Sequence, residues 1–205
     1  MKKDLEEASI WIKSTTGSEK YTITPLRQEA SSRSYYRIIT DGLSYILAVQ
    51  SKEAPEKNSA ASGSSPAKFL YAAKLLANNS VRVPKIYAFS ENLQFMLQED
   101  LGDITLDIHK EIENRFILEE ALEQLSLIYS VDQDVLKAFS YDDLLQQTTN
   151  FLDIFDDRNI SIDENEVKVM QALRKKLVGQ IMEQPFLPTH NDFERRNFLL
   201  HNKQI

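Results

Sequence analysis

The sequence contains no cysteine among its 205 residues, which excludes disulfide bonds, thiolate metal sites and a cysteine nucleophile. It also has no apolar run of about 18 residues, so we expect no transmembrane helix. Acidic residues follow Lys2 and Lys3, where a secretory signal would have an apolar segment. We therefore expect a cytoplasmic protein.

Positive charge is also scarce. The sequence has 24 Lys and Arg against 31 Asp and Glu, and its formal net charge is −7. This balance argues against nucleic acid or an anionic membrane as a partner held by bulk charge, although a local pocket can still bind phosphates. Hydrophobic residues at 42% and charged residues at 27% are ordinary for a globular protein. A chain of this length can bury one core or two small lobes.

The first half of the sequence is typical of β-strands with one helix inserted, after a short N-terminal helix. Runs rich in β-branched and aromatic residues predict strands at 21–26, 34–39, 44–50, 83–89 and 95–99. Asp41-Gly42 between the second and third runs is a hairpin turn signal. Apolar residues at helical spacing predict helices over 4–14 and 69–76, and residues 51–67 have the composition of a loop.

The second half is typical of helices. Amphipathic spacing predicts them over 112–129, 141–155 and 167–182, with a polar connector at 156–164. The sequence therefore predicts an α+β protein of two lobes. Residues 1–101 would form an antiparallel sheet with one helix, and residues 102–205 a helical lobe.

The sharpest motif is residues 190–197, which read HNDFERRN and precede the apolar run 198–200. In kinase-type phosphoryl transfer an Asp accepts the proton of the attacking hydroxyl. An Asn five positions later binds a Mg²⁺ that bridges the nucleotide phosphates. Asp192 is therefore the candidate base and Asn197 the candidate metal ligand.

The other polar residues of this motif have less defined roles. His190 belongs to the candidate catalytic set, and we expect it to hold the loop by hydrogen bonds. Arg195 and Arg196 could contact phosphate or carry solvated charge. The alternative for the whole motif is a polar surface loop in which Asp and Asn cap turns.

A second candidate segment is residues 97–103, which run from a strand into a glycine turn where the two lobes would join. A hinge of this kind can offer backbone N–H and C=O groups to adenine, and Gln98, Glu99 and Leu101 are the candidate contacts. A plain connector between a strand and a helix fits the same residues equally well.

A third candidate segment is residues 29–36, between the first two strands, where a phosphate-covering loop would lie. It has no glycine, but its small side chains let backbone amides approach phosphates, and Ser hydroxyls can donate hydrogen bonds. Ser31, Ser32 and Arg33 are the candidate contacts. An ordinary hairpin loop is an equal alternative.

Two parts of a kinase site are missing from the sequence. The third strand ends in Gln50, where a kinase has a lysine, and glutamine cannot supply a cation. Lys52 lies two residues on and would point to the same face of a strand. The helix over 69–76 has no Glu to pair with such a lysine.

Taken in order, these blocks resemble the aminoglycoside phosphotransferase/choline kinase superfamily. Within it they are most similar to the bacterial N-acetylmuramate/N-acetylglucosamine anomeric kinases of cell-wall recycling. The resemblance rests on residues 30–38, 83–88, 96–103 and 190–197, and it spans nearly the whole chain. It implies a two-lobe protein-kinase-like fold, ATP as donor, Mg²⁺ as cofactor and a sugar hydroxyl as acceptor. That branch also tends to lack a lysine on the third strand.

The sequence departs from the family at two places. Residues 193–195 read FER where a His or another small polar pair is more usual. The Asp-Phe-x-Asp segment expected after a strand beginning near residue 203 is absent, so we interpret the chain as C-terminally truncated. Three hypotheses remain: a small-molecule kinase, a non-catalytic nucleotide-binding pseudokinase, and an α+β domain without a nucleotide site.

Overall fold

The computed structural model describes the chain except residues 1, 27–32, 51–65, 107–114, 133, 135, 137, 150–154, 156, 157, 159 and 203. By its contacts the chain divides into two compact units. Unit 1 comprises Met1–Pro55, Gly63–Val131 and Thr189–Ile205, and unit 2 comprises Glu56–Ser62 and Asp132–Pro188. The lobe boundary expected at residue 102 stays a prediction.

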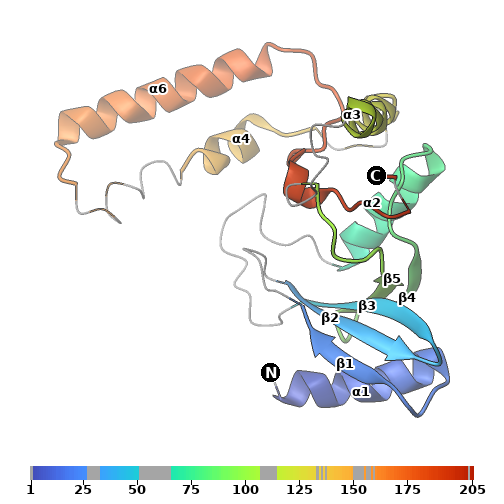
Figure 1. The fold of residues 1–205 in the computed structure, drawn as a ribbon. Coiled ribbons are helices and arrows are strands. Elements are labelled where there is room, and N and C mark those ends of the chain that lie inside the picture. The colour runs from blue at the N-terminus through green and yellow to red at the C-terminus, as the bar shows by residue number, and fades with distance from the viewer. Residues whose placement is uncertain are drawn as a thin grey trace. The chain divides into compact units, whose positions relative to one another are not determined.

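Unit 1 is built on a five-stranded antiparallel sheet in the order β1-β2-β3-β5-β4 (Figure 1). Its strands are β1 (Thr22–Pro25), β2 (Arg33–Thr40), β3 (Leu43–Gln50), β4 (Ile86–Ser90) and β5 (Phe95–Glu99). The α+β class and the five predicted strands are confirmed. The predicted start of β4 at residue 83 is wrong, because Pro84 has no N–H for the ladder and pairing begins at Ile86.

The turn between β2 and β3 forms where the sequence predicts it. Asp41 and Gly42 have φ values of 50° and 79°, and Thr40 pairs with Leu43 directly across the turn. Positive φ at both central residues is the requirement of a tight type I′ hairpin turn, which Asp-Gly satisfies. This two-residue turn fixes the register of the whole β2–β3 pair.

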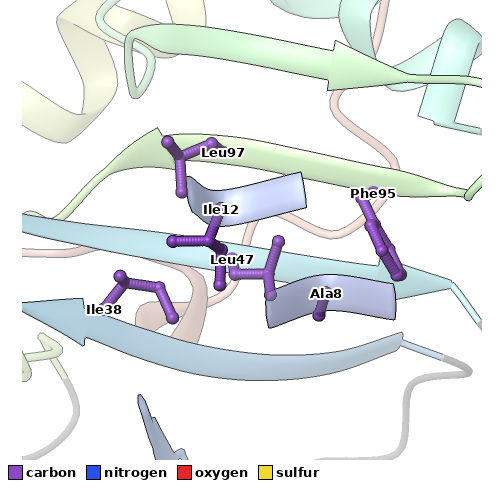
Figure 2. Close-up of a cluster of buried hydrophobic side chains, with 6 residues drawn as sticks. All are labelled: Ala8, Ile12, Ile38, Leu47, Phe95 and Leu97. Carbon is purple, nitrogen blue, oxygen red and sulfur yellow. The ribbon is translucent and has the colours of Figure 1, made fainter. Parts of the chain in front are cut away.

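The hydrophobic core of unit 1 lies between α1 (Lys2–Thr16) and one face of the sheet (Figure 2). Ala8 and Ile12 of the helix are fully buried there. The buried residues of the sheet are Ile38, Leu47, Phe95 and Leu97. Alternate residues of a strand point to the same face, so these positions define the face that α1 covers.

The residues that alternate with these along each strand lie on the other face of the sheet. Arg33 pairs with Gln50 across β2 and β3, and Ile46 lies between Arg37 and Gln98. The helix α2 (Pro66–Asn78) lies on this side of the sheet, opposite α1 (Figure 1). The face opposite α1 therefore carries several of the residues singled out for the nucleotide.

Unit 1 also contains α3 (Arg115–Tyr129), whose buried residues are Ile117, Ala121 and Ile128. Their spacing of four and seven positions is the period of a helix with one apolar stripe. The predicted start at residue 112 lies outside the described residues. None of the described helices combines the length and apolarity that crossing a membrane requires.

Unit 2 contains α4 (Tyr141–Gln147) and α6 (Glu164–Met182). The predicted end of α4 at residue 155 is wrong, because the helix ends at Gln147 before a turn at Thr148. Arg174 of α6 donates to the carbonyl of Leu145 at 2.9 Å and to the hydroxyl of Thr148 at 2.9 Å. These contacts supply hydrogen-bond donors at the end of the helix, where carbonyl groups have no intrahelical partners.

The α6 helix begins three residues before its predicted start because of a capping box. The carboxylate of Asp163 accepts from the backbone N–H of Glu166 at 2.8 Å, and Glu166 accepts from the N–H of Asp163 at 2.8 Å. Such a reciprocal pair satisfies two of the backbone donors that a helix leaves open at its N-terminus.

We expect Asp163→Ala to destabilise unit 2 by about 1 kcal/mol, because the substitution removes this cap. For a chain of this size, the melting temperature of the helical signal should fall by about 2–4 °C in circular dichroism. Asp142→Ala, an exposed first-turn residue of α4 that is not the cap, is the control. Equal small shifts in both variants would contradict the role of the cap.

Candidate active site

The loop at 190–197 brings the candidate base and the candidate metal ligand together. The Asn197 amide Nδ2 donates to the main-chain carbonyl of Asp192 at 2.9 Å and to its carboxylate Oδ2 at 2.7 Å. The loop is closed by backbone hydrogen bonds from Glu194 N to Asp192 O and from Asn197 N to Glu194 O. A short 3₁₀ helix, η2 (Arg195–Asn197), completes it.

The contacts of Asn197 determine which atom of its amide faces outward. Asn197 contacts the main-chain carbonyl and the carboxylate of Asp192, and both are acceptors. The NH₂ group of its amide therefore faces them, and its Oδ1 points away from Asp192. An amide oxygen and a carboxylate are ligands that Mg²⁺ accepts, and Mg²⁺ commonly takes one or two protein oxygens beside substrate phosphates. Oδ1 of Asn197 fits such an ion. In the described parts of the chain, no group of three or more His, Cys, Asp or Glu forms a metal cluster.

His190 holds the loop through aromatic packing. Its ring is stacked on Phe198, with centroids 6.4 Å apart, and meets the edge of Phe193 at 5.8 Å. Phe193 and Phe198 contact each other edge to face at 4.6 Å. These ring contacts fix the place of His190 in the loop, and its expected hydrogen bonds stay a prediction.

Charged and apolar residues around the loop differ in part from expectation. Arg196 forms an ion pair of 2.7 Å with Glu194, and both side chains are about half exposed. Phe186 and Leu187, which precede the loop, are 42% and 60% exposed. Pro188, next to the loop, is buried.

The chain after the loop is tied to the chain after β5. Thr105 and Leu199 form an antiparallel bridge. Leu106 N donates to Phe198 O at 3.1 Å, and Leu200 N donates to Ile104 O at 2.8 Å. This pairing holds the candidate catalytic loop close to the predicted hinge.

The hinge residues have well-defined surroundings. The carboxylate of Glu99 accepts from Lys85 N at 3.0 Å, and the carbonyl of Leu101 lies 3.2 Å from Nδ1 of His201. Gln98 Oε1 is buried, and within the described residues it has no hydrogen-bond partner. The turn itself occurs at Gly102, whose φ of 89° suits glycine.

The hinge is braced by an arginine that the sequence analysis did not single out. Arg37 Nε and Nη2 donate to the two carboxylate oxygens of Asp100 at 2.6 and 3.0 Å. Arg37 Nη1 and Nη2 also reach Asp103, both at 2.8 Å. Ser44 Oγ and Gly102 N complete the hydrogen bonds to Asp100. Four N–H···O contacts from one guanidinium thus connect β2 to the hinge.

This network fixes the charge state of its members. Burial would raise the pKa of Asp100, but hydrogen bonds from Arg37, Ser44 and Gly102 lower it to about 2. The hydrogen bond from Arg37 likewise lowers the pKa of Asp103, and hydrogen bonds to Asp103 and Asp100 raise the pKa of Arg37. The three groups are therefore all charged at neutral pH.

On the phosphate side, Ser31, Ser32 and Lys52 lie outside the described residues. Arg33 is described at the start of β2. Its Nε donates to Gln50 Oε1 at 3.1 Å, and its guanidinium carbon lies 4.9 Å from the ring centroid of Phe69.

A cavity of about 330 Å³ in unit 1 joins the hinge and the catalytic loop. Its lining includes Glu99 and Leu101 of the hinge, and His190 and Asn197 of the loop. Arg33, Gln98 and Asp192 are not part of this lining. The cavity shows that two segments about 90 residues apart in sequence share one hollow.

Residues 22–205 match the sequence model of the phosphotransferase enzyme family. No curated protein sequence matches the chain significantly.

Solved structures of similar fold include small-molecule kinases. A thermostable mutant of aminoglycoside phosphotransferase APH(4)-Ia, in a ternary complex with AMP-PNP and hygromycin B, has a TM-score of 0.61 at 18% identity. That match covers 97% of this chain and 68% of the other. Choline kinase LicA from Streptococcus pneumoniae has a TM-score of 0.64 at 16% identity, covering 97% and 66%. The streptomycin–ATP–APH(2")-IIa complex has a TM-score of 0.58 at 15% identity, covering 97% and 67%. At these identities the likeness shows the fold.

Proposed function

The chain belongs to the phosphotransferase enzyme family, and from this premise we propose that it transfers the γ-phosphoryl group of ATP to a hydroxyl of a small molecule. The observation that carries the proposal is the pairing of Asp192 with Asn197 through both the main chain and the side chain. It is the local geometry that a base and a metal ligand need in phosphoryl transfer.

In the proposed reaction the acceptor oxygen attacks the γ-phosphorus, and its proton passes to the carboxylate of Asp192. The bond from the γ-phosphorus to the bridging oxygen breaks, and ADP leaves. Asn197 would hold Mg²⁺ through Oδ1, and the ion would neutralise charge on the phosphates. Both side chains are exposed, so substrates can reach them.

The nucleotide base would lie at the hinge, with backbone groups of Glu99 and Leu101 as contacts. The cavity of unit 1 supports this position, because Glu99 and Leu101 line it together with His190 and Asn197 of the loop. Ser31, Ser32 and Arg33 would contact the phosphates. A cytoplasmic location, where ATP is supplied, belongs to the same proposal.

For the acceptor we propose an amino sugar such as N-acetylmuramate or N-acetylglucosamine, phosphorylated at the anomeric hydroxyl in cell-wall recycling. The support is the resemblance of residues 30–38, 83–88 and 96–103 to that branch, since the fold alone does not determine the acceptor. ADP release should follow addition of either sugar and should be absent with the methyl glycosides, in which the anomeric hydroxyl is blocked. Equal rates with choline or hygromycin B in place of the sugars would contradict the choice of acceptor.

A nucleotide-binding protein without turnover is the second candidate. It is favoured by Gln50 at the end of β3, where catalytically active kinases have a lysine. Sustained, Mg²⁺-dependent consumption of ATP would exclude this candidate.

We expect Asn197→Ala to remove the Mg²⁺-dependent part of ATP binding. At ATP about 100-fold above its Kd, a ligand that binds only the folded state adds about 2.7 kcal/mol of stability. For a chain of this size that corresponds to a rise of about 5–10 °C in melting temperature. The part of this rise that needs Mg²⁺ should disappear in the variant. Asn165→Ala, an exposed residue of α6, is the control, and an undiminished Mg²⁺ effect in Asn197→Ala would contradict the assignment.

A further inference from the structure

Within the described residues, the third strand has no cationic side chain at its end, where kinases use one in phosphoryl transfer. Kinases place a lysine near the end of the third strand, where it binds nucleotide phosphates and pairs with a Glu on the neighbouring helix. Here β3 ends in Gln50, and α2 has no Glu. The negative charge of a triphosphate still has to be balanced at this place.

The structure brings an arginine to the position in question. Arg33 on β2 is the direct cross-strand partner of Gln50, so the two side chains leave the sheet on the same face. This is the face opposite α1. The hydrogen bond from Arg33 Nε to Gln50 Oε1, at 3.1 Å, brings the guanidinium to the end of β3.

The neighbouring helix contacts the same arginine. The guanidinium carbon of Arg33 lies 4.9 Å from the ring centroid of Phe69 in α2. A cation over an aromatic face is attracted by the ring quadrupole and keeps its full charge. Phe69 therefore couples α2 to the cation, as a Glu does in kinases.

The second arginine on this face has a different role. Arg37 lies four residues along β2 and makes four hydrogen bonds to the carboxylates of Asp100 and Asp103. The two carboxylates balance its charge, so Arg37 has a structural role. Arg33 lies nearer the end of β3, where a kinase has its lysine.

We propose that Arg33, positioned by Gln50 and Phe69, is the phosphate-binding cation of this site and replaces the lysine of the third strand. The inference rests on the proposed function, because it assumes that a nucleotide triphosphate binds on this face. A guanidinium is always charged and binds phosphate oxygens through two parallel N–H donors. This arrangement divides one function between two strands: β2 supplies the charge and β3 supplies its support.

The test compares binding of adenosine, ADP·Mg²⁺ and ATP·Mg²⁺ by isothermal titration calorimetry. Arg33→Met should weaken ATP binding by about 10- to 100-fold, the range expected for loss of a charged hydrogen bond. Adenosine binding should not change. In the double variant Arg33→Met/Gln50→Lys, the new lysine should restore most of the ATP affinity. Arg115→Met, which removes one exposed positive charge from the same unit, is the matched control.

The outcomes separate this inference from the proposed function. If the unmodified chain binds neither adenosine nor ATP, the proposed function is overturned and this inference with it. If the chain binds ATP and Arg33→Met binds it equally well, only this inference is overturned. Equal losses of adenosine and ATP binding would show a structural role for Arg33 and would also overturn it. Gln50→Leu keeps the cation and removes its support, so it is informative even if Arg33→Met folds poorly. It should weaken ATP binding severalfold at unchanged adenosine affinity, and unchanged ATP binding would overturn the role of Gln50.

Discussion

Replacement of Asp192 by alanine should reduce the rate of phosphoryl transfer by about 10²- to 10⁴-fold, the usual contribution of a positioned general base. ATP affinity should stay nearly unchanged, because the proposed nucleotide contacts lie on the hinge and on β2. A loss in kcat without a matching loss in binding is the signature of an interaction made in the transition state.

Asp192→Asn makes the test sharper. The amide has nearly the shape of the carboxylate and leaves the backbone contact from Asn197 to residue 192 in place, but it cannot accept the proton. ADP release under steady-state conditions should fall as far as in the alanine variant. Asp142→Asn, an exposed acidic residue in unit 2, is the control for loss of one negative charge. Retention of the rate in either Asp192 variant would rule out Asp192 as the base.

The strands and the loop could be predicted from the sequence because their signals are local. Alternation of apolar residues and the Asp41-Gly42 turn predicted β2 and β3, and spacing within residues 190–197 predicted that Asp192 and Asn197 act together. The contact of their side chains agrees with that prediction of proximity, while their chemical roles stay a proposal.

The end of α4 depends on a contact that local pattern cannot show. Apolar spacing continues beyond Gln147, but Arg174, which comes from a later helix, bonds to the last turn. The contact that braces the hinge also joins distant parts of the sequence, since Arg37 and Asp100 are 63 residues apart.

The pairing of Arg33 with Gln50 could have been predicted from the sequence. A two-residue turn after Thr40 fixes every partner along the hairpin, and counting outward from it gives that pair.

Replacement of Arg37 by alanine should be the most destabilising single change in this network, at about 3 kcal/mol at neutral pH. The carboxylate of Asp100 is only 8% exposed and would lose two charged hydrogen bonds, while Asp103 would remain nearby with like charge. Removal of one partner of a buried ion pair leaves an uncompensated charge, which costs more than the pair contributes.

The same network predicts a dependence of stability on pH. The pKa of Asp100 is about 2 in the folded state, against an ordinary value of 3.8. Below the ordinary value the unfolded chain binds more protons than the folded chain, so stability falls with pH. The contribution of Asp100 to the free energy of unfolding is therefore complete above about pH 4 and is lost as the pH falls toward 2. Because a shift of one pKa unit corresponds to about 1.36 kcal/mol, this contribution amounts to about 2 kcal/mol. In Arg37→Ala this part of the acid sensitivity should largely disappear.

Trp11 is the only tryptophan of the chain and lies against Phe95, with ring centroids 5.8 Å apart, so its fluorescence reports unfolding of unit 1 alone. Urea unfolding followed by this signal at pH 7 and pH 3 measures both effects. Arg115→Ala, which removes an exposed pair with Glu119 one helical turn away, should cost only about 0.3–0.5 kcal/mol at pH 7. If Arg37→Ala costs no more than this control at pH 7, or is as sensitive to acid as the unmodified chain, then the four contacts do not hold the hinge. A large loss at pH 7 that shrinks at pH 3 would instead show that charge pairing through Arg37 fixes the hinge on which the proposed nucleotide contacts depend.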